Sequence, residues 1–115
     1  MRSLSVQIQP ARSPGLNMQR LDAAFEAIAT DRYLVEHHAF NNGVDKEPYF
    51  NYTFGTRHAL QLWESIQVRI FHSDEFEPHM KCASMVMCSS EEGWDDYLLL
   101  FHFDPAVGLD ATTTL

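Results

Sequence analysis

Hydrophobic residues follow a helical spacing in the first part of the chain. They recur every three or four positions after Asn17, which is a suitable N-cap, and this pattern predicts an amphipathic helix. A second helical piece is expected to run to about His38, before Asn-Asn-Gly at 41–43 ends the helical region. The apolar stripe of the predicted helix consists of Met18, Leu21, Phe25 and Ile28.

After Pro48 the pattern changes to one typical of β-strands. Residues 49–54 alternate around aromatic side chains, and 82–88 and 97–103 are apolar at successive positions, as in central strands. A turn is expected at 89–96, which contains Gly93. Three strands and their connection therefore follow directly from the pattern.

Residues 57–72 fit two interpretations. The even positions from Leu60 to Ile70 are apolar except Glu64, which favours a long or bent strand. A helix at 57–65 is the competing interpretation, because some apolar residues there also have helical spacing, namely Ala59, Leu62, Trp63 and Ile66. We expect the strand.

These elements predict a single α+β domain over residues 1–115. The N-terminal helical region is expected to pack on a four-stranded antiparallel β-meander. Residues 1–16, where apolar and polar positions alternate, are expected to form an N-terminal arm or a fifth, edge strand. Residues 106–115 follow Pro105 and are expected to form a flexible tail.

Composition predicts a cytoplasmic protein. No apolar run approaches the roughly 20 residues needed to span a bilayer, and no signal peptide is recognisable. Cys82 and Cys88 lie on one face of a predicted strand, about 20 Å apart, which is too far for a disulfide. Free thiols fit a reducing compartment.

Charge is segregated along the chain. Residues 1–70 carry seven basic and seven acidic residues, whereas residues 71–115 carry nine acids and only Lys81, which accounts for the net charge of −8. The acids gather at 74–77 and 91–96. Successive turns of a meander lie at opposite ends of its sheet, so we expect two acidic lobes about 20 Å apart.

No motif in the chain identifies a reaction. The nucleophile elbow and the glycine-rich phosphate loops are absent, and His72, His79 and His102 lack zinc-ligand spacing. We therefore expect no metal, no cofactor and no catalytic residue. Direct binding of nucleic acid is disfavoured, because a phosphate backbone requires a basic face.

The leading interpretation is a small, non-catalytic binding or inhibitor protein that docks acidic loops on a basic protein. Immunity proteins, anti-defence proteins of phages and DNA mimics are of this type, and a nuclease or another nucleic-acid-binding protein is a suitable partner. Trp94, between acids in a turn, is a candidate interface residue; the alternative is that its ring folds back over the sheet edge. The predicted partner-binding residues are Asp74, Glu75, Glu77, Glu91, Glu92, Trp94, Asp95 and Asp96.

Two alternatives stay open at this point. A small enzyme or ligand-binding domain would hold a pocket between helix and sheet, with Glu64 as a buried acid or base. Its lining candidates are Tyr49, Tyr52, Trp63, His72, Tyr97 and His102. A structural subunit would instead pair edge strands between copies.

Overall fold

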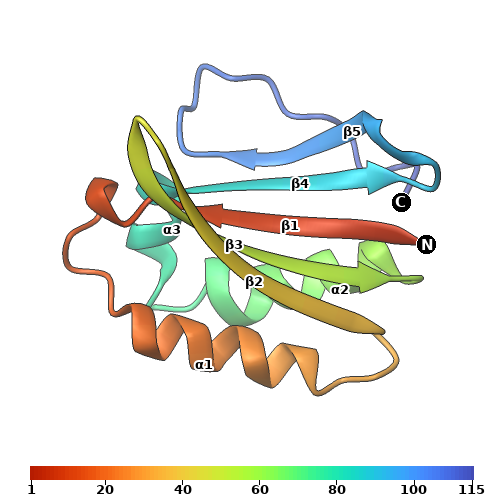
Figure 1. Cartoon of the computed structure of the whole chain (residues 1–115), viewed down its shortest axis with the longest axis horizontal. Helices are drawn as coiled ribbons and strands as arrows, with labels where there is room; N and C mark the ends of the chain where they lie inside the picture. The colour runs from red at the N-terminus through yellow and green to blue at the C-terminus, as the bar shows by residue number, and fades with distance from the viewer.

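Five antiparallel strands form one sheet in the order β2-β3-β1-β4-β5. The computed structural model describes all 115 residues, and Figure 1 shows the helices on one side of this sheet. The strands are β1 (Arg2–Ile8), β2 (His37–Asp45), β3 (Glu47–Thr56), β4 (Ser84–Ser90) and β5 (Gly93–His102). The helical elements are η1 (Pro10–Arg12), α1 (Met18–Ala29), α2 (Ala59–Ile66), the π-helical turn η2 (Gln67–Phe71) and α3 (Glu77–Ala83).

The predicted α+β class is confirmed, but the sheet is not a simple meander. The N-terminal strand, expected at an edge, lies at the centre as β1 between β3 and β4. The order β1-α1-β2-β3-α2-β4 is that of the split β-α-β arrangement, to which β5 adds a fifth strand. β1 suits the central position because Leu4, Val6 and Ile8 are fully buried.

The hydrophobic core lies between the sheet and α1, α2 and η2. The side chain of Asn17 accepts a hydrogen bond from the Arg20 N–H at 3.1 Å, so the predicted N-cap of α1 is confirmed. Phe25 on α1 stacks on Tyr52 of β3, with 4.3 Å between ring centroids. This contact fixes α1 against the sheet.

The predicted helical piece up to His38 is wrong. The Asp31 side chain accepts hydrogen bonds from the N–H groups of Tyr33 and Leu34, forming a turn after α1, and the chain then enters β2. All nine residues of β2 pair with β3, and Lys46, with a positive φ of 65°, turns the hairpin. Asn41, Asn42 and Gly43 therefore lie within a strand instead of ending a helix.

The predicted strand over 57–72 is also wrong, and the competing helix is the structure. The side chains of Ala59, Leu62, Trp63 and Ile66 are buried, so α2 buries one helical stripe. The wider π-helical turn η2 then changes the phase, so that the adjacent residues Ile70 and Phe71 are both buried. The apolar residues at even positions therefore belong to two successive helical segments, α2 and η2, and not to one face of a strand.

The last two strands differ from their predicted bounds. Cys82 lies in α3, and β4 begins only at Ser84; both cysteines are free, with Cys82 exposed and Cys88 buried. The turn is shorter than expected, because β4 extends to Ser90 and β5 begins at Gly93. Residues 106–115 have no regular structure, but Leu115 packs against the core.

Candidate functional site

The β4–β5 turn is a two-residue connection made by Glu91 and Glu92. The Ser90 hydroxyl donates to the carbonyl of Gly93 at 3.1 Å and accepts from the N–H of Glu92 at 3.2 Å. Gly93 has a φ of +132°, a conformation that side-chain-bearing residues rarely adopt. A serine and a glycine therefore shape the turn that carries the predicted acids.

Beyond this turn, β5 bulges out of the sheet. Cys88 pairs with Leu98 and Ser90 pairs with Gly93, so the single residue Ser89 of β4 faces the four residues 94–97 of β5. A bulge of this kind re-aims side chains. Trp94 and Tyr97 are accordingly 45% and 49% exposed, although both lie within a strand.

The acids of the turn are not equivalent. Glu91 is bound by the amino group of Met1 at 2.8 Å and lies 3.8 Å from Nε of Arg2. The hydrogen bond and charge of that amino group lower the pKa of Glu91. Glu91 thus ties the turn to the start of β1.

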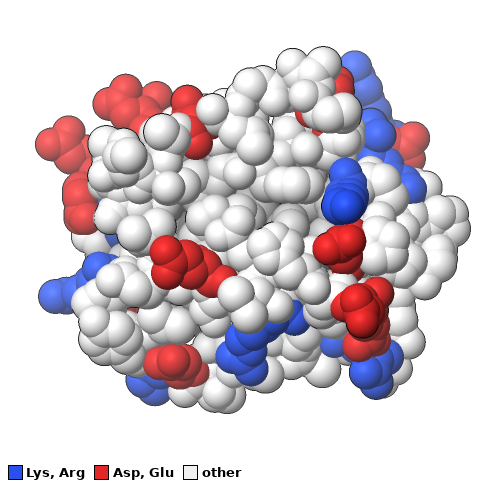
Figure 2. Space-filling view, turned by 180° about the vertical axis from the view of Figure 1, so that it is seen from behind, with Lys and Arg blue, Asp and Glu red and all other residues white.

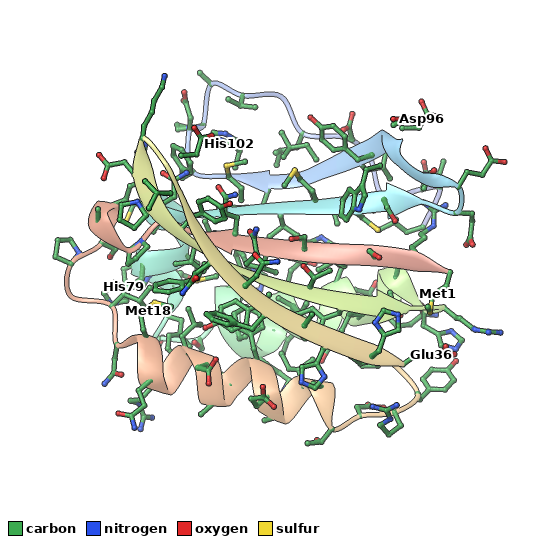
Figure 3. All side chains as sticks on the ribbon, viewed as in Figure 1. Met1, Met18, Glu36, His79, Asp96 and His102 are labelled. Atoms are coloured by element: carbon green, nitrogen blue, oxygen red, sulfur yellow. The ribbon has the colours of Figure 1, made fainter.

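The remaining acids have no such partner. Glu92, Asp95 and Asp96 are exposed and take part in none of the ion pairs of the chain. Asp96 points away from the sheet in Figure 3. Figure 2, seen from the helix side, shows acidic side chains gathered at the edge where the β4–β5 turn lies. We call Glu92, Trp94, Asp95, Asp96 and Tyr97 the acidic tip.

The second predicted cluster, Asp74, Glu75 and Glu77, differs in structure and in charge. It lies where η2 is followed by α3 and not in a turn between strands. Arg20 binds Glu75 through two nitrogens, and this hydrogen bonding lowers the pKa of Glu75. Glu77 lies 3.5 Å from Lys81, so only Asp74 lacks an ion pair.

Only the acidic tip has a strong excess of negative charge, and β4 lies between the two clusters in the chain. α3 precedes β4 and the acidic tip follows it, so a seven-residue strand of roughly 20 Å lies between them. Of the eight predicted partner-binding residues, the structure brings Glu92, Trp94, Asp95 and Asp96 together as free groups.

Glu64 does not line a pocket. It lies in α2, and its side chain is exposed, because the buried stripe of the helix passes through Leu62, Trp63 and Ile66 instead. The proposed buried acid or base is therefore wrong. Of the aromatic candidates, Tyr52 is in the core against Phe25, and burial raises its pKa.

An apolar cleft lies beside β5, and the sequence predicts only some of the residues that line it. Two adjoining cavities of about 460 and 150 Å³ share Lys81 and Phe101. Three of the expected lining residues are there, Trp63 and His72 in the smaller cavity and His102 in the larger one. The other residues of this aromatic cleft include Phe71, Phe103, Val107 and Leu109.

The aromatic cleft is built by edge-to-face contacts. The ring of Phe71 lies 5.3 Å from that of Trp63 and 5.1 Å from that of Phe101. Phe71 reaches both because it lies in η2, and π-helical turns are frequent at functional sites. The signal in the sequence was an apolar run, Ile70-Phe71, that breaks the helical spacing.

One serine–histidine contact was not predicted. The Ser13 hydroxyl lies 2.5 Å from Nδ1 of His79, which ties the loop after η1 to α3. His79 makes no ion pair with an acid, so the contact holds two segments together. No three His, Cys, Asp or Glu side chains converge as metal ligands would.

Comparison with known proteins adds no relationship. No family model, no curated protein and no solved structure matches the chain. None of its helices has the length and apolar character to cross a membrane.

Proposed function

We propose that this chain is a non-catalytic binding protein that docks its acidic tip on a basic surface of another protein. One observation carries the proposal: the bulge in β5 exposes Trp94 next to three carboxylates that have no ion-pair partner. A half-exposed tryptophan offers a large apolar surface to a partner, and interface hot spots are enriched in it. The free carboxylates would attract and orient a cationic partner.

The proposed partner is a protein whose own ligand is an anion, such as a nuclease or another nucleic-acid-binding protein. Such a protein presents a face of Lys and Arg, to which Glu92, Asp95 and Asp96 are complementary. An inhibitor of this kind acts by occupying the basic face. Immunity, anti-defence and DNA-mimic proteins act in this way, and the proposal is that this chain is a protein of that type.

Comparative capture tests this proposal. The tagged chain is compared with a tip variant, Glu92→Gln/Asp95→Asn/Asp96→Asn, and with Trp94→Ala. The matched control is Asp74→Asn/Glu75→Gln/Glu77→Gln, which changes the net charge by the same three units at the other end of β4. We expect basic proteins to be retained by the wild type and the control and lost from the tip variant and Trp94→Ala. Equal capture by all four proteins would contradict the proposal.

The aromatic cleft supports a second candidate function, which is binding of a small apolar ligand. Its larger cavity of about 460 Å³ is within the usual range for ligand pockets, and its walls are mainly aromatic and aliphatic. The probe anilinonaphthalene sulfonate would then bind to the wild type. Binding should be lost in Val107→Trp, which fills the cleft from the half-exposed tail side. Unchanged probe fluorescence in that variant would remove this candidate.

A further inference from the structure

The two edge strands of the sheet, β5 and β2, differ in whether other parts of the chain bind their outer backbone groups. The outer edge of β5 is covered by the chain itself: the N–H of Leu99 donates to Oδ2 of Asp110 at 2.8 Å, and its carbonyl accepts from the N–H of Asp110 at 2.9 Å. The residues after β5 thus satisfy both backbone groups of Leu99. This edge is closed at its centre.

The outer edge of β2 has no such cover. β2 pairs with β3 over all nine residues without a bulge, and every residue of β2 except Gly43 is exposed. No segment of the chain donates to or accepts from its outer backbone groups. Natural edge strands are commonly protected by Pro, Lys, a bulge or shortness, and residues 37–45 have none of these. β2 is therefore a free template for another strand.

We propose that a second copy of this chain pairs with β2, antiparallel and two-fold symmetric, to form a continuous ten-stranded sheet. One register pairs all nine residues of β2 with their counterparts, and it is centred on Asn41. This register aligns Asn41 with itself and His37 with Asp45 of the second copy. The inference is independent of the acidic tip, which lies at the opposite edge of the sheet.

Charge complementarity favours a second copy over an unrelated strand. Glu36 directly precedes β2, and Lys46 in the hairpin turn directly follows it, so this register brings the two residues to the same end of the interface in opposite copies, and symmetry repeats the pair at the other end. His37 and Asp45 add a pair of a hydrogen-bond donor and an acceptor at each end. No like charges are opposed between residues 36 and 46, although the chain carries a net charge of −8.

The apolar side chains of β2 support the same arrangement. Phe40 and Val44 are 48% and 75% exposed, and both lie on the face of β2 that carries Phe50 and Tyr52 on β3. In the proposed register the Phe40 rings of the two copies become diagonal neighbours, close enough for aromatic side chains to touch. Val44 comes to lie opposite His38 of the second copy.

Three side chains at this edge already have contacts within the chain, and one of them is the ring of His37, which lies over Gly55 of β3. Nε of Arg57 lies 2.9 Å from Oε1 of Glu36, and Nε2 of His38 lies 3.5 Å from Oε1 of Glu26. Lys46 makes no ion pair within the chain. Glu36 has a second carboxylate oxygen, so it can accept from Lys46 of the other copy without releasing Arg57.

Sedimentation velocity over a wide concentration range tests the proposal through a charge swap. Glu36→Lys opposes two lysines at each end of the interface, and Lys46→Glu opposes two glutamates. We expect each single variant to weaken dimerisation by about 10- to 30-fold, because each bad pair occurs twice. The double variant Glu36→Lys/Lys46→Glu restores both pairs and should dimerise like the wild type.

Two controls keep the result interpretable. Arg57→Ala removes the partner of Glu36 within the chain and should leave the dimer unchanged, and circular dichroism checks that each variant is folded. Hydrogen exchange of residues 37–45 should slow as wild-type concentration rises. A wild type that stays monomeric at every concentration would overturn the proposal and leave this edge to a strand of another protein. A dimer equally strong in both single variants would also overturn it.

Discussion

Replacing Phe25 by alanine tests whether α1 is fixed to the sheet as described. Phe25 is 1% exposed, and its ring lies 4.3 Å from that of Tyr52 and 5.8 Å from that of Phe54. Truncating a buried phenylalanine to alanine typically costs about 3–5 kcal/mol of unfolding free energy. That loss is a large fraction of the roughly 5–15 kcal/mol that stabilises an ordinary domain.

The expected thermal effect follows from the size of the chain. A domain of 115 residues loses roughly 4 °C in Tm per kcal/mol, so Phe25→Ala should lower Tm by about 15 °C. Urea unfolding monitored by circular dichroism measures the free energy, and Gln19→Ala on the exposed side of the same helix is the control. The control should change stability by less than about 0.5 kcal/mol. A loss below about 1 kcal/mol for Phe25→Ala would refute the packing of α1 on β3.

Two further predictions concern single side chains. In Trp63→Phe the remaining tryptophan is the half-exposed Trp94, so the neutral quencher acrylamide should quench its fluorescence strongly and the anion iodide only weakly. In Trp94→Phe the remaining tryptophan is Trp63, which is 4% exposed, so acrylamide should quench its fluorescence little. Equal iodide and acrylamide quenching of Trp94 would contradict a negative field at the acidic tip. Burial, together with the charges of Asp22 and Glu26, raises the pKa of Tyr52, so the folded protein holds this phenol neutral. The unfolded phenol ionises near pH 10, so the contribution of Tyr52 to the free energy of unfolding should be constant below that pH and fall above it. Urea unfolding between pH 8 and 11 should show a smaller fall in Tyr52→Phe, and identical profiles would show that Tyr52 is not the cause.

The α+β class could be predicted because its main signals are local. The stripe of α1, its Asn17 cap and the alternation of β3 each need only a few neighbouring residues to be recognised. The strand order could not be predicted. The alternation at Leu4, Val6 and Ile8 shows that a strand exists, but it does not show which strands pair with it. Glu64 was misplaced for a related reason: η2 changes the helical phase, and two short phases imitate one strand face.

The sequence predicts which acidic residues surround Trp94, but it does not predict how the acidic tip is arranged in space. The sequence places Trp94 among acids but leaves open whether its ring folds back over the sheet edge, and in the structure the side chain is 45% exposed. The bulge in β5 depends on pairing with β4, and the capture of Glu91 by the amino group of Met1 depends on β1 lying beside β4. Contacts between residues about 90 positions apart leave no local pattern, so the sequence alone groups Glu91 with the partner-binding acids.

Association kinetics show whether the acidic tip binds a basic protein surface, which is the claim to be tested. The captured partner is bound to the wild type, the tip variant and the charge-matched control at about 20 mM and about 300 mM salt. We expect the wild type and the control to associate at least about 10-fold faster at low salt, because free carboxylates steer a cationic partner. The tip variant should associate slowly at both salt concentrations. An association rate that is the same for the tip variant and the wild type at low salt would contradict the claim.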